Sequence, residues 1–126
     1  MKKLFSLLLL LTLLSCEKEK VEIEITAEDY LCAKTWYREW AITGLRTSSA
    51  ITFYKDGTGL FNGYTFYKDG SQKHDSVLVN WKLHEGGKYY TLDNSDRHLI
   101  LKLDADSFIY QNEITKGTIF RWAHKQ

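Results

Sequence analysis

The sequence predicts an all-β fold, a single eight-stranded antiparallel up-and-down barrel preceded by one short helix. From Thr35 onward, apolar and polar residues alternate with the period of two that is typical of half-buried strands. Glycine and Asx turn signals recur every 8–12 residues, a spacing typical of all-β sandwiches and barrels. The segment TFYKDG occurs at residues 52–57 and again at 65–70, so two consecutive strands end in similar turns. A simple meander has this pattern.

The first fifteen residues are of a different kind from the rest of the chain. Lys2 and Lys3 form a basic start, an apolar stretch follows from Leu4 to Leu14, and the small residue Ser15 precedes Cys16. This order indicates a secretory signal peptide over residues 1–15. The apolar stretch is well short of the ~20 residues that a membrane-spanning helix needs.

The sequence LLSC at residues 13–16 resembles the bacterial lipobox. The resemblance implies that Cys16 is lipidated and becomes the first residue of the mature protein. It also implies an exported lipoprotein, anchored to the membrane of the bacterial cell envelope by its acyl chains, with the outer membrane as the expected location. Several acyl chains hold a protein stably at a membrane surface that it does not span.

Residues 16–25 are predicted to be a lipidated tether between the anchor and the folded domain. Residues 17–20 (EKEK) carry charge and no large apolar group, whereas Val21, Ile23 and Ile25 alternate with glutamates. The alternation leaves a short extra edge strand as the second interpretation. The folded domain is then expected over residues 26–126.

One short helix is predicted over residues 27–34. Thr26 and Asp29 have the spacing of a capping box, and the residues after Thr26 are good helix formers. We expect the helix to bury Tyr30 and Leu31. Cys32 has no partner if Cys16 is lipidated, so we expect a small, buried apolar residue, with a reactive thiol as the alternative.

Eight strands follow in order. On the first, Trp36, Trp40 and Ile42 share one face with Arg38. The second, which contains Ile51 and Phe53, ends at Asp56-Gly57, a dipeptide that favours a primed hairpin turn. The remaining strands are expected at residues 60–67, 77–83, 89–92, 99–103, 108–112 and 118–123. The chain contains no proline, so none of these strands is interrupted by one.

Several segments together resemble the small lipocalin-like domains of exported bacterial lipoproteins. They are Trp36 at the start of the first strand, FYKDGTG at residues 53–59, VNWKL at 79–83, YYTLD at 89–93 and LILKLDADSF at 99–108. The resemblance implies a barrel that binds a small molecule. In lipocalins an arginine on the last strand lies against the first-strand tryptophan, which implies a structural pair of Trp36 and Arg121. Lys34 stands where lipocalins have glycine.

Large apolar side chains are predicted to face the barrel interior and to line a pocket: Trp40, Phe53, Trp81, Leu101 and Phe120. An eight-stranded barrel either fills with side chains or holds one small ligand. The first functional hypothesis is therefore the binding of a small apolar or amphipathic ligand. The second is a filled barrel that contacts an envelope protein or a glycan through outer-face tyrosines, for which the candidates are Tyr37, Tyr54, Tyr64, Tyr67 and Tyr110.

The sequence gives no support to other function classes. Without Lys2 and Lys3, fifteen basic residues balance sixteen acidic ones, which leaves no electrostatic signature of nucleic-acid binding. No nucleophile-elbow, zinc-protease or CxxC motif is present. We therefore expect no catalytic residue, no metal and no cofactor, and not an enzyme. The four histidines are expected on the surface, and the aspartates at residues 93, 96, 104 and 106 in turns, with calcium binding as the weaker alternative.

Overall fold

A computed structural model describes residues 23–114 and 116–123. The predicted signal peptide, Cys16 and most of the predicted tether lie outside these residues. Residues 23–25 form no strand, and the side chain of Ile23 is 86% exposed. Within the described residues, the structure has no helix with the length and apolar character to cross a membrane.

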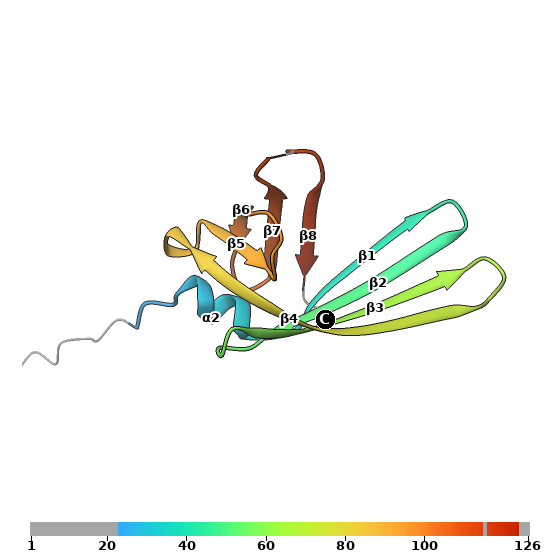
Figure 1. Cartoon of the computed structure of the whole chain (residues 1–126), viewed down its shortest axis with the longest axis horizontal. Helices are drawn as coiled ribbons and strands as arrows, with labels where there is room; N and C mark the ends of the chain where they lie inside the picture. Colours follow the sequence, from blue (N-terminus) through green and yellow to red (C-terminus); the bar gives the residue numbers. More distant parts are fainter. Residues whose placement is uncertain (1–22, 115, 124–126) are drawn as a thin grey trace, which may run out of the picture.

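The predicted eight-stranded antiparallel barrel with one short helix is confirmed. Each strand pairs with the next along the chain, and β1 pairs with β8 to close the barrel (Figure 1). The elements are α2 (Ala27–Cys32), β1 (Trp36–Ile42), β2 (Leu45–Phe53), β3 (Thr58–Tyr67), β4 (Gln72–His84), the 3₁₀ turn η1 (Glu85–Gly87), β5 (Tyr89–Leu92), β6 (His98–Leu103), β7 (Ser107–Asn112) and β8 (Ile119–Ala123).

The helix α2 begins with the predicted capping box. The Asp29 backbone N–H donates to Thr26 Oγ1 at 3.2 Å, and the Thr26 backbone N–H donates to Asp29 Oδ2 at 3.0 Å. The helix ends at Cys32 rather than at Lys34. Leu31 is completely buried, whereas Cys32 is half-buried against the core and is a free thiol. Burial raises the pKa of this thiol, which disfavours the reactive thiolate.

The two TFYKDG segments form matching turns, although the first is not the primed turn that was predicted. In the first, Gly57 N–H donates to Tyr54 O at 3.1 Å and Tyr54 N–H donates to Thr58 O at 2.9 Å. Only the glycine has a positive φ, +88°, because the Asp56 carboxylate accepts the Thr58 N–H and holds a local Asx turn. A single left-handed glycine at the end of the turn corresponds to a glycine bulge. Gly70 repeats this geometry.

One end of the barrel is filled by aromatic side chains. Phe108 lies at the centre of this core, with ring centroids 5.0–6.0 Å from those of four other rings, namely Trp36, Phe53, Tyr90 and Tyr110. The helix α2 packs at the same end, where the Trp36 indole N–H donates to Leu31 O at 3.0 Å. The barrel interior at this end is therefore filled by side chains.

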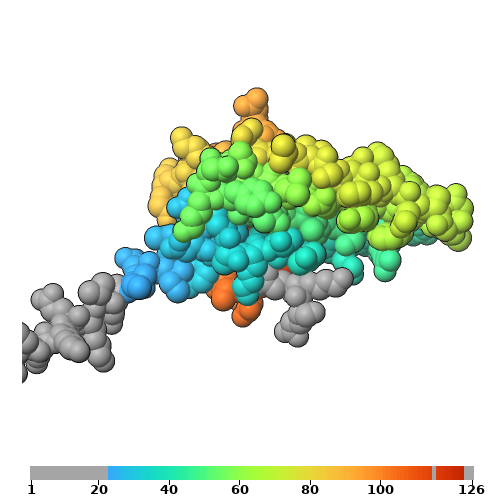
Figure 2. All heavy atoms as spheres, turned by 90° about the horizontal axis from the view of Figure 1, so that it is seen from below, coloured from blue at the N-terminus to red at the C-terminus, as the bar shows by residue number. Residues whose placement is uncertain are grey.

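The other end is open because the strands differ in length. Strands β1–β4 have 7–13 residues, whereas β5–β8 have four to six. β1 pairs with β8 only at Tyr37 and Ala123, and β4 pairs with β5 only through its last four residues. The first four strands therefore project beyond the closed part as a sheet, which is visible in Figure 1 and as the long extension in Figure 2. We call this projection the flared end.

Candidate functional site

The inner face of the flared end carries a pocket of about 360 Å³, which we call the inner pocket. The register places its residues in rows across β1–β4. The row nearest the filled core is apolar and consists of Trp36, Ile51, Phe61 and Val77. The middle row consists of Arg38, Ser49, Gly63 and Asp75. The outermost row consists of Trp40, Thr47, Thr65 and Lys73. The inner face therefore changes from apolar to polar toward the mouth.

Small residues in the middle row create the space. Ser49 and Gly63 lie between Arg38 and Asp75, so the floor of the inner pocket has no bulky side chain there. A Cβ atom at Gly63 would lie 3.3 Å from the Phe61 ring, so the glycine leaves room for this aromatic wall. Trp40 and Trp122 are further aromatic lining residues. Aromatic walls with a few polar groups are typical of small-molecule sites.

Arg38 is the one arginine that lines the inner pocket. Its Cζ lies 4.6 Å from the ring centroid of Phe120 and 5.9 Å from that of Trp122, so it bridges from β1 to the aromatic side chains of β8. Within residues 23–114 and 116–123, no carboxylate forms a salt bridge with Arg38. Asp75, at the far end of the same row, is paired with Lys73 at 3.2 Å.

The five predicted pocket residues have different positions. Phe53 and Trp81 belong to the filled core, where their ring centroids are 5.6 Å apart and the Trp81 indole N–H donates to Tyr54 O and Thr58 O. Phe120 is half-buried beneath Arg38. Trp40, which is 41% exposed, is the member of the set that lines the inner pocket.

Leu101 does not face the interior as predicted. It is 47% exposed, because His98 and Ile100 face inward and leave Leu101 on the outer face; a β-bulge between Ile100 and Lys102 then brings Leu103 to the interior. Ile100 and Leu103 pack against the core instead, opposite Tyr110 and Phe108. One extra residue in a strand reverses the face of those that follow it.

The predicted stack of Trp36 and Arg121 is replaced by another contact. On β8 the inward residues are Phe120 and Trp122, so the intervening Arg121 points outward and is exposed, whereas Trp36 is completely buried. The arginine that stacks on the β8 aromatic rings is Arg38. The first-strand alternation contained the signal for this residue, since Arg38 shares a face with Trp36 and Trp40.

The histidines are only partly where they were expected. His74 is exposed and stacks on Tyr64, with ring centroids 4.3 Å apart, and His84 Nε2 lies 3.0 Å from Thr91 Oγ1. His98 is not a surface residue, because it is inward-facing on β6 opposite Tyr90. Its Nδ1 is buried without a hydrogen-bond partner, and burial lowers its pKa, so the imidazole is neutral near pH 7. His124 lies outside the described residues.

Two of the aspartates considered for calcium accept backbone hydrogen bonds. The Asp104 carboxylate accepts the backbone N–H groups of Asp106 and Ser107, and the Asp93 carboxylate accepts that of Asn80. No group of three or more potential metal ligands occurs in the part of the chain that the structure describes. The Asp104 carboxylate therefore holds its own turn, and the Asp93 carboxylate joins the end of β5 to β4.

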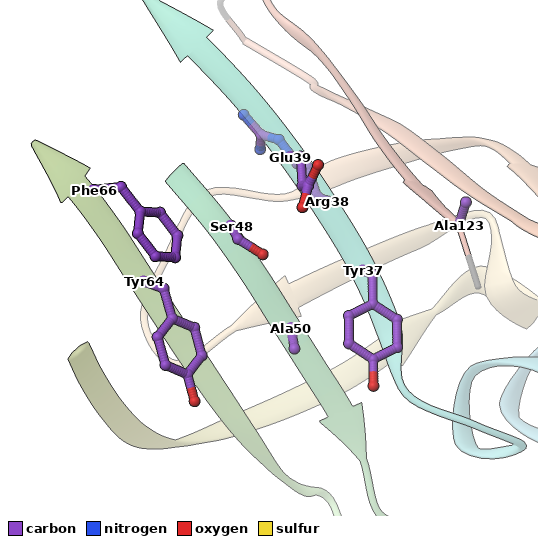
Figure 3. Close-up of a pocket in the computed structure, with 8 residues that line it drawn as sticks. All are labelled: Tyr37, Arg38, Glu39, Ser48, Ala50, Tyr64, Phe66 and Ala123. Carbon is purple, nitrogen blue, oxygen red and sulfur yellow. The ribbon is translucent and has the colours of Figure 1, made fainter. Parts of the chain in front are cut away.

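A second hollow, of about 490 Å³, lies on the outside of the sheet, and we call it the outer groove. Figure 3 shows Tyr37 on β1 and Tyr64 on β3 on either side of the small residues Ser48 and Ala50 on β2. Phe66, Glu39 and Ala123 extend the lining, and Arg38 borders this groove as well as the inner pocket. Of the predicted outer-face tyrosines, Tyr37, Tyr54, Tyr64 and Tyr67 are exposed, whereas Tyr110 is buried in the core because it faces inward on β7.

Comparisons with protein-family models, with curated proteins and with solved structures give no significant match to this chain.

Proposed function

We propose that this protein is an exported, lipid-anchored, lipocalin-like binding protein whose inner pocket takes up a small amphipathic ligand. The inner pocket supports the proposal most directly. It combines a volume of about 360 Å³, at the lower end of the usual ~300–1,000 Å³ of small-molecule sites, with aromatic walls and a polar rim. The filled core beneath it limits the ligand to the flared end.

The order of the rows on the inner face supports an amphipathic rather than a purely apolar ligand. Phe61 and Trp122 offer apolar surface on the core side, while Ser49 and Thr47 place hydroxyl groups beside it. A ligand with one apolar and one polar part could bury its apolar part without leaving these hydroxyl groups unsatisfied. The proposed role is binding without catalysis.

The binding test uses residues 16–126 carrying Cys16→Ser, after circular dichroism and cooperative urea unfolding have established that they fold. Tryptophan fluorescence is titrated with medium-chain amphiphiles, because Trp40 and Trp122 line the inner pocket. We expect a saturable signal that Ser49→Phe abolishes by filling the pocket floor. Saturable binding that is unchanged in folded Ser49→Phe would contradict the assignment to this pocket.

The lipid anchor is tested separately on the protein purified from bacterial membranes. The signal sequence and Cys16 predict an N-terminus at Cys16 that carries acyl chains, which intact-mass spectrometry detects. An unmodified chain that begins at Met1 would disprove the anchor without affecting the pocket.

The outer groove favours a second candidate function, a contact with another envelope protein or a glycan. Tyrosine is suited to partly solvated contact surfaces because its ring is apolar and its hydroxyl group can hydrogen-bond, and Tyr37 and Tyr64 both line the groove. A photo-crosslinker at Ser48, inside the groove, should capture this partner in native membranes, whereas one at the exposed Lys102 should not. Identical crosslinking patterns from the two positions would count against this function.

A further inference from the structure

We propose that the ligand of the inner pocket carries a carboxylate head group and that Arg38 binds it. The inference rests on the proposed binding function and goes further by assigning a chemical class to the ligand. It depends on three features of Arg38: its inward position, its lack of a carboxylate partner among the described residues and its place beside aromatic rings that have no oxygen acceptor.

The position of Arg38 is set by the alternation of β1. Arg38 lies between Trp36 and Trp40 on the inner face, half-buried and in the same row as Ser49. A cation in such a place loses part of its hydration, and this loss is costly unless an anion or acceptor compensates it. Trp36 and Trp40 flank it on the same face, so an anion bound here would be partly shielded from water.

The anion that compensates Arg38 is not supplied by the described residues. Glu39 is adjacent in sequence but lies on the other face of the sheet, where it lines the outer groove. Asp75 lies three strands away in the same row, roughly 14 Å at the usual strand spacing, and is already neutralised by Lys73. The inner pocket therefore has an excess of positive charge on the β1 side.

The aromatic contacts leave the hydrogen-bond donors of Arg38 available. The guanidinium carbon of Arg38 lies over the ring of Phe120, 4.6 Å from its centroid, a cation–π contact with a group that has no oxygen acceptor. All five N–H donors lie in the plane of the group and form a fork that matches the two oxygens of a carboxylate. The aromatic contacts thus place the guanidinium in the inner pocket without supplying an anion to its fork, while Trp40, Phe61 and Trp122 offer apolar surface to the remainder of the ligand.

The test compares laurate with dodecanol, which has the same chain length but no charge, each below its aggregation concentration. Residues 16–126 carrying Cys16→Ser are titrated with both probes by tryptophan fluorescence. We expect laurate to bind about ten- to a hundredfold more tightly than dodecanol, the range expected for hydrogen bonds to a charged group. The preference for laurate should fall as salt screens the charge, whereas the affinity for dodecanol should not.

Arg38→Met removes the charge and keeps an apolar stem. It should abolish the preference for laurate and leave dodecanol binding unchanged. Arg46→Met is a matched control, because the Arg46 guanidinium also stacks on a phenylalanine, 4.5 Å from the centroid of Phe66, but on the outer face. This control should retain the preference in full.

The outcomes separate the inference from the function on which it rests. Equal binding of the two probes, or a laurate preference that persists in folded Arg38→Met, would overturn the role of Arg38 and leave the binding function standing. Absence of saturable binding for both probes would overturn both. If Arg38→Met does not fold, the salt dependence of the unsubstituted protein tests the role of Arg38 instead. A preference for laurate over dodecanol that does not change with salt would contradict a charged contact.

Discussion

Gly87 is predicted to be the least replaceable glycine of the barrel, because the helix α2 packs directly against it. A Cβ atom at Gly87 would lie 2.5 Å from the Cβ of Ala27, and the backbone there has a φ of +94°. Gly86, the preceding residue, also has a positive φ, +67°, but an added Cβ would meet nothing within 4 Å. Comparing alanine substitutions at the two positions therefore distinguishes the cost of backbone strain, which both share, from the cost of the contact with α2, which only Gly87 has.

The expected magnitudes follow from these two terms. A left-handed conformation costs a non-glycine residue about 1–2 kcal/mol, which applies to both variants. Gly87→Ala adds the cost of overpacking against Ala27, about 1–3 kcal/mol. We expect the free energy of unfolding to fall by about 1–2 kcal/mol in Gly86→Ala and by about 2–5 kcal/mol in Gly87→Ala. Domains of this kind have roughly 5–15 kcal/mol in total, so the second loss is severe.

Urea unfolding followed by tryptophan fluorescence measures both losses. With m-values of roughly 1–3 kcal/mol per M urea, the midpoint should shift clearly further in Gly87→Ala than in Gly86→Ala. Adding Ala27→Gly to Gly87→Ala removes the methyl group of Ala27 that the new Cβ would contact. The double-mutant cycle of these two substitutions should therefore give a coupling energy of about 0.5–3 kcal/mol. Equal midpoints for the two alanine variants, together with zero coupling, would refute the close packing of α2 on η1.

Two further predictions concern the core and the helix cap. Phe108→Ala should cost about 3–5 kcal/mol of unfolding free energy in the same urea assay, since four aromatic rings surround Phe108, and Phe66→Ala on the outer face should cost clearly less. The pKa of Asp29 is lowered from 3.8 to about 2, chiefly by the hydrogen bond from Lys55 and then by those from Thr26. The stabilisation by Asp29 is therefore complete above pH ~4 and is lost as the pH falls through 2. Asp29→Asn should be less stable than the unsubstituted protein near pH 7, and the difference should shrink below pH ~4 and vanish near pH ~1. A difference in unfolding free energy that is the same at pH ~1 as at pH 7 would contradict this linkage.

The elements themselves could be predicted closely from local sequence. The capping box of Thr26 and Asp29 marked the start of α2, and the glycines of the two TFYKDG segments marked turns that the structure places at Gly57 and Gly70. Both signals act over a few residues, because a cap or a turn satisfies its hydrogen bonds locally. The type of the turn was wrong, since the sequence signal did not show that the Asp56 carboxylate would hold its own backbone at negative φ.

The candidate site could be predicted only in part. Alternation placed Trp40 and Arg38 on the inner face, which is correct, but it also placed Leu101 there. Ile100 and Leu103 both face inward because a bulge between Ile100 and Lys102 inserts one residue, so regular alternation counted from Leu103 gave the wrong face to Leu101, and the sequence of β6 does not distinguish a bulged strand from a regular one. The pairing of Trp36 with Arg121 came from a resemblance and not from the alternation of β8, which turns Arg121 outward.

The sequence by itself determined where strands and turns lie and, for most strands, which face of each is apolar, because these properties depend on neighbours one to four residues away. Tertiary structure alone decided that one end of the barrel is filled and the other open, since this depends on which long strand lies opposite which short one. It also decided that the guanidinium of Arg38 meets the ring of Phe120, more than eighty residues further along the chain. That contact exists only when β1 and β8 close the barrel, so no local pattern could contain it.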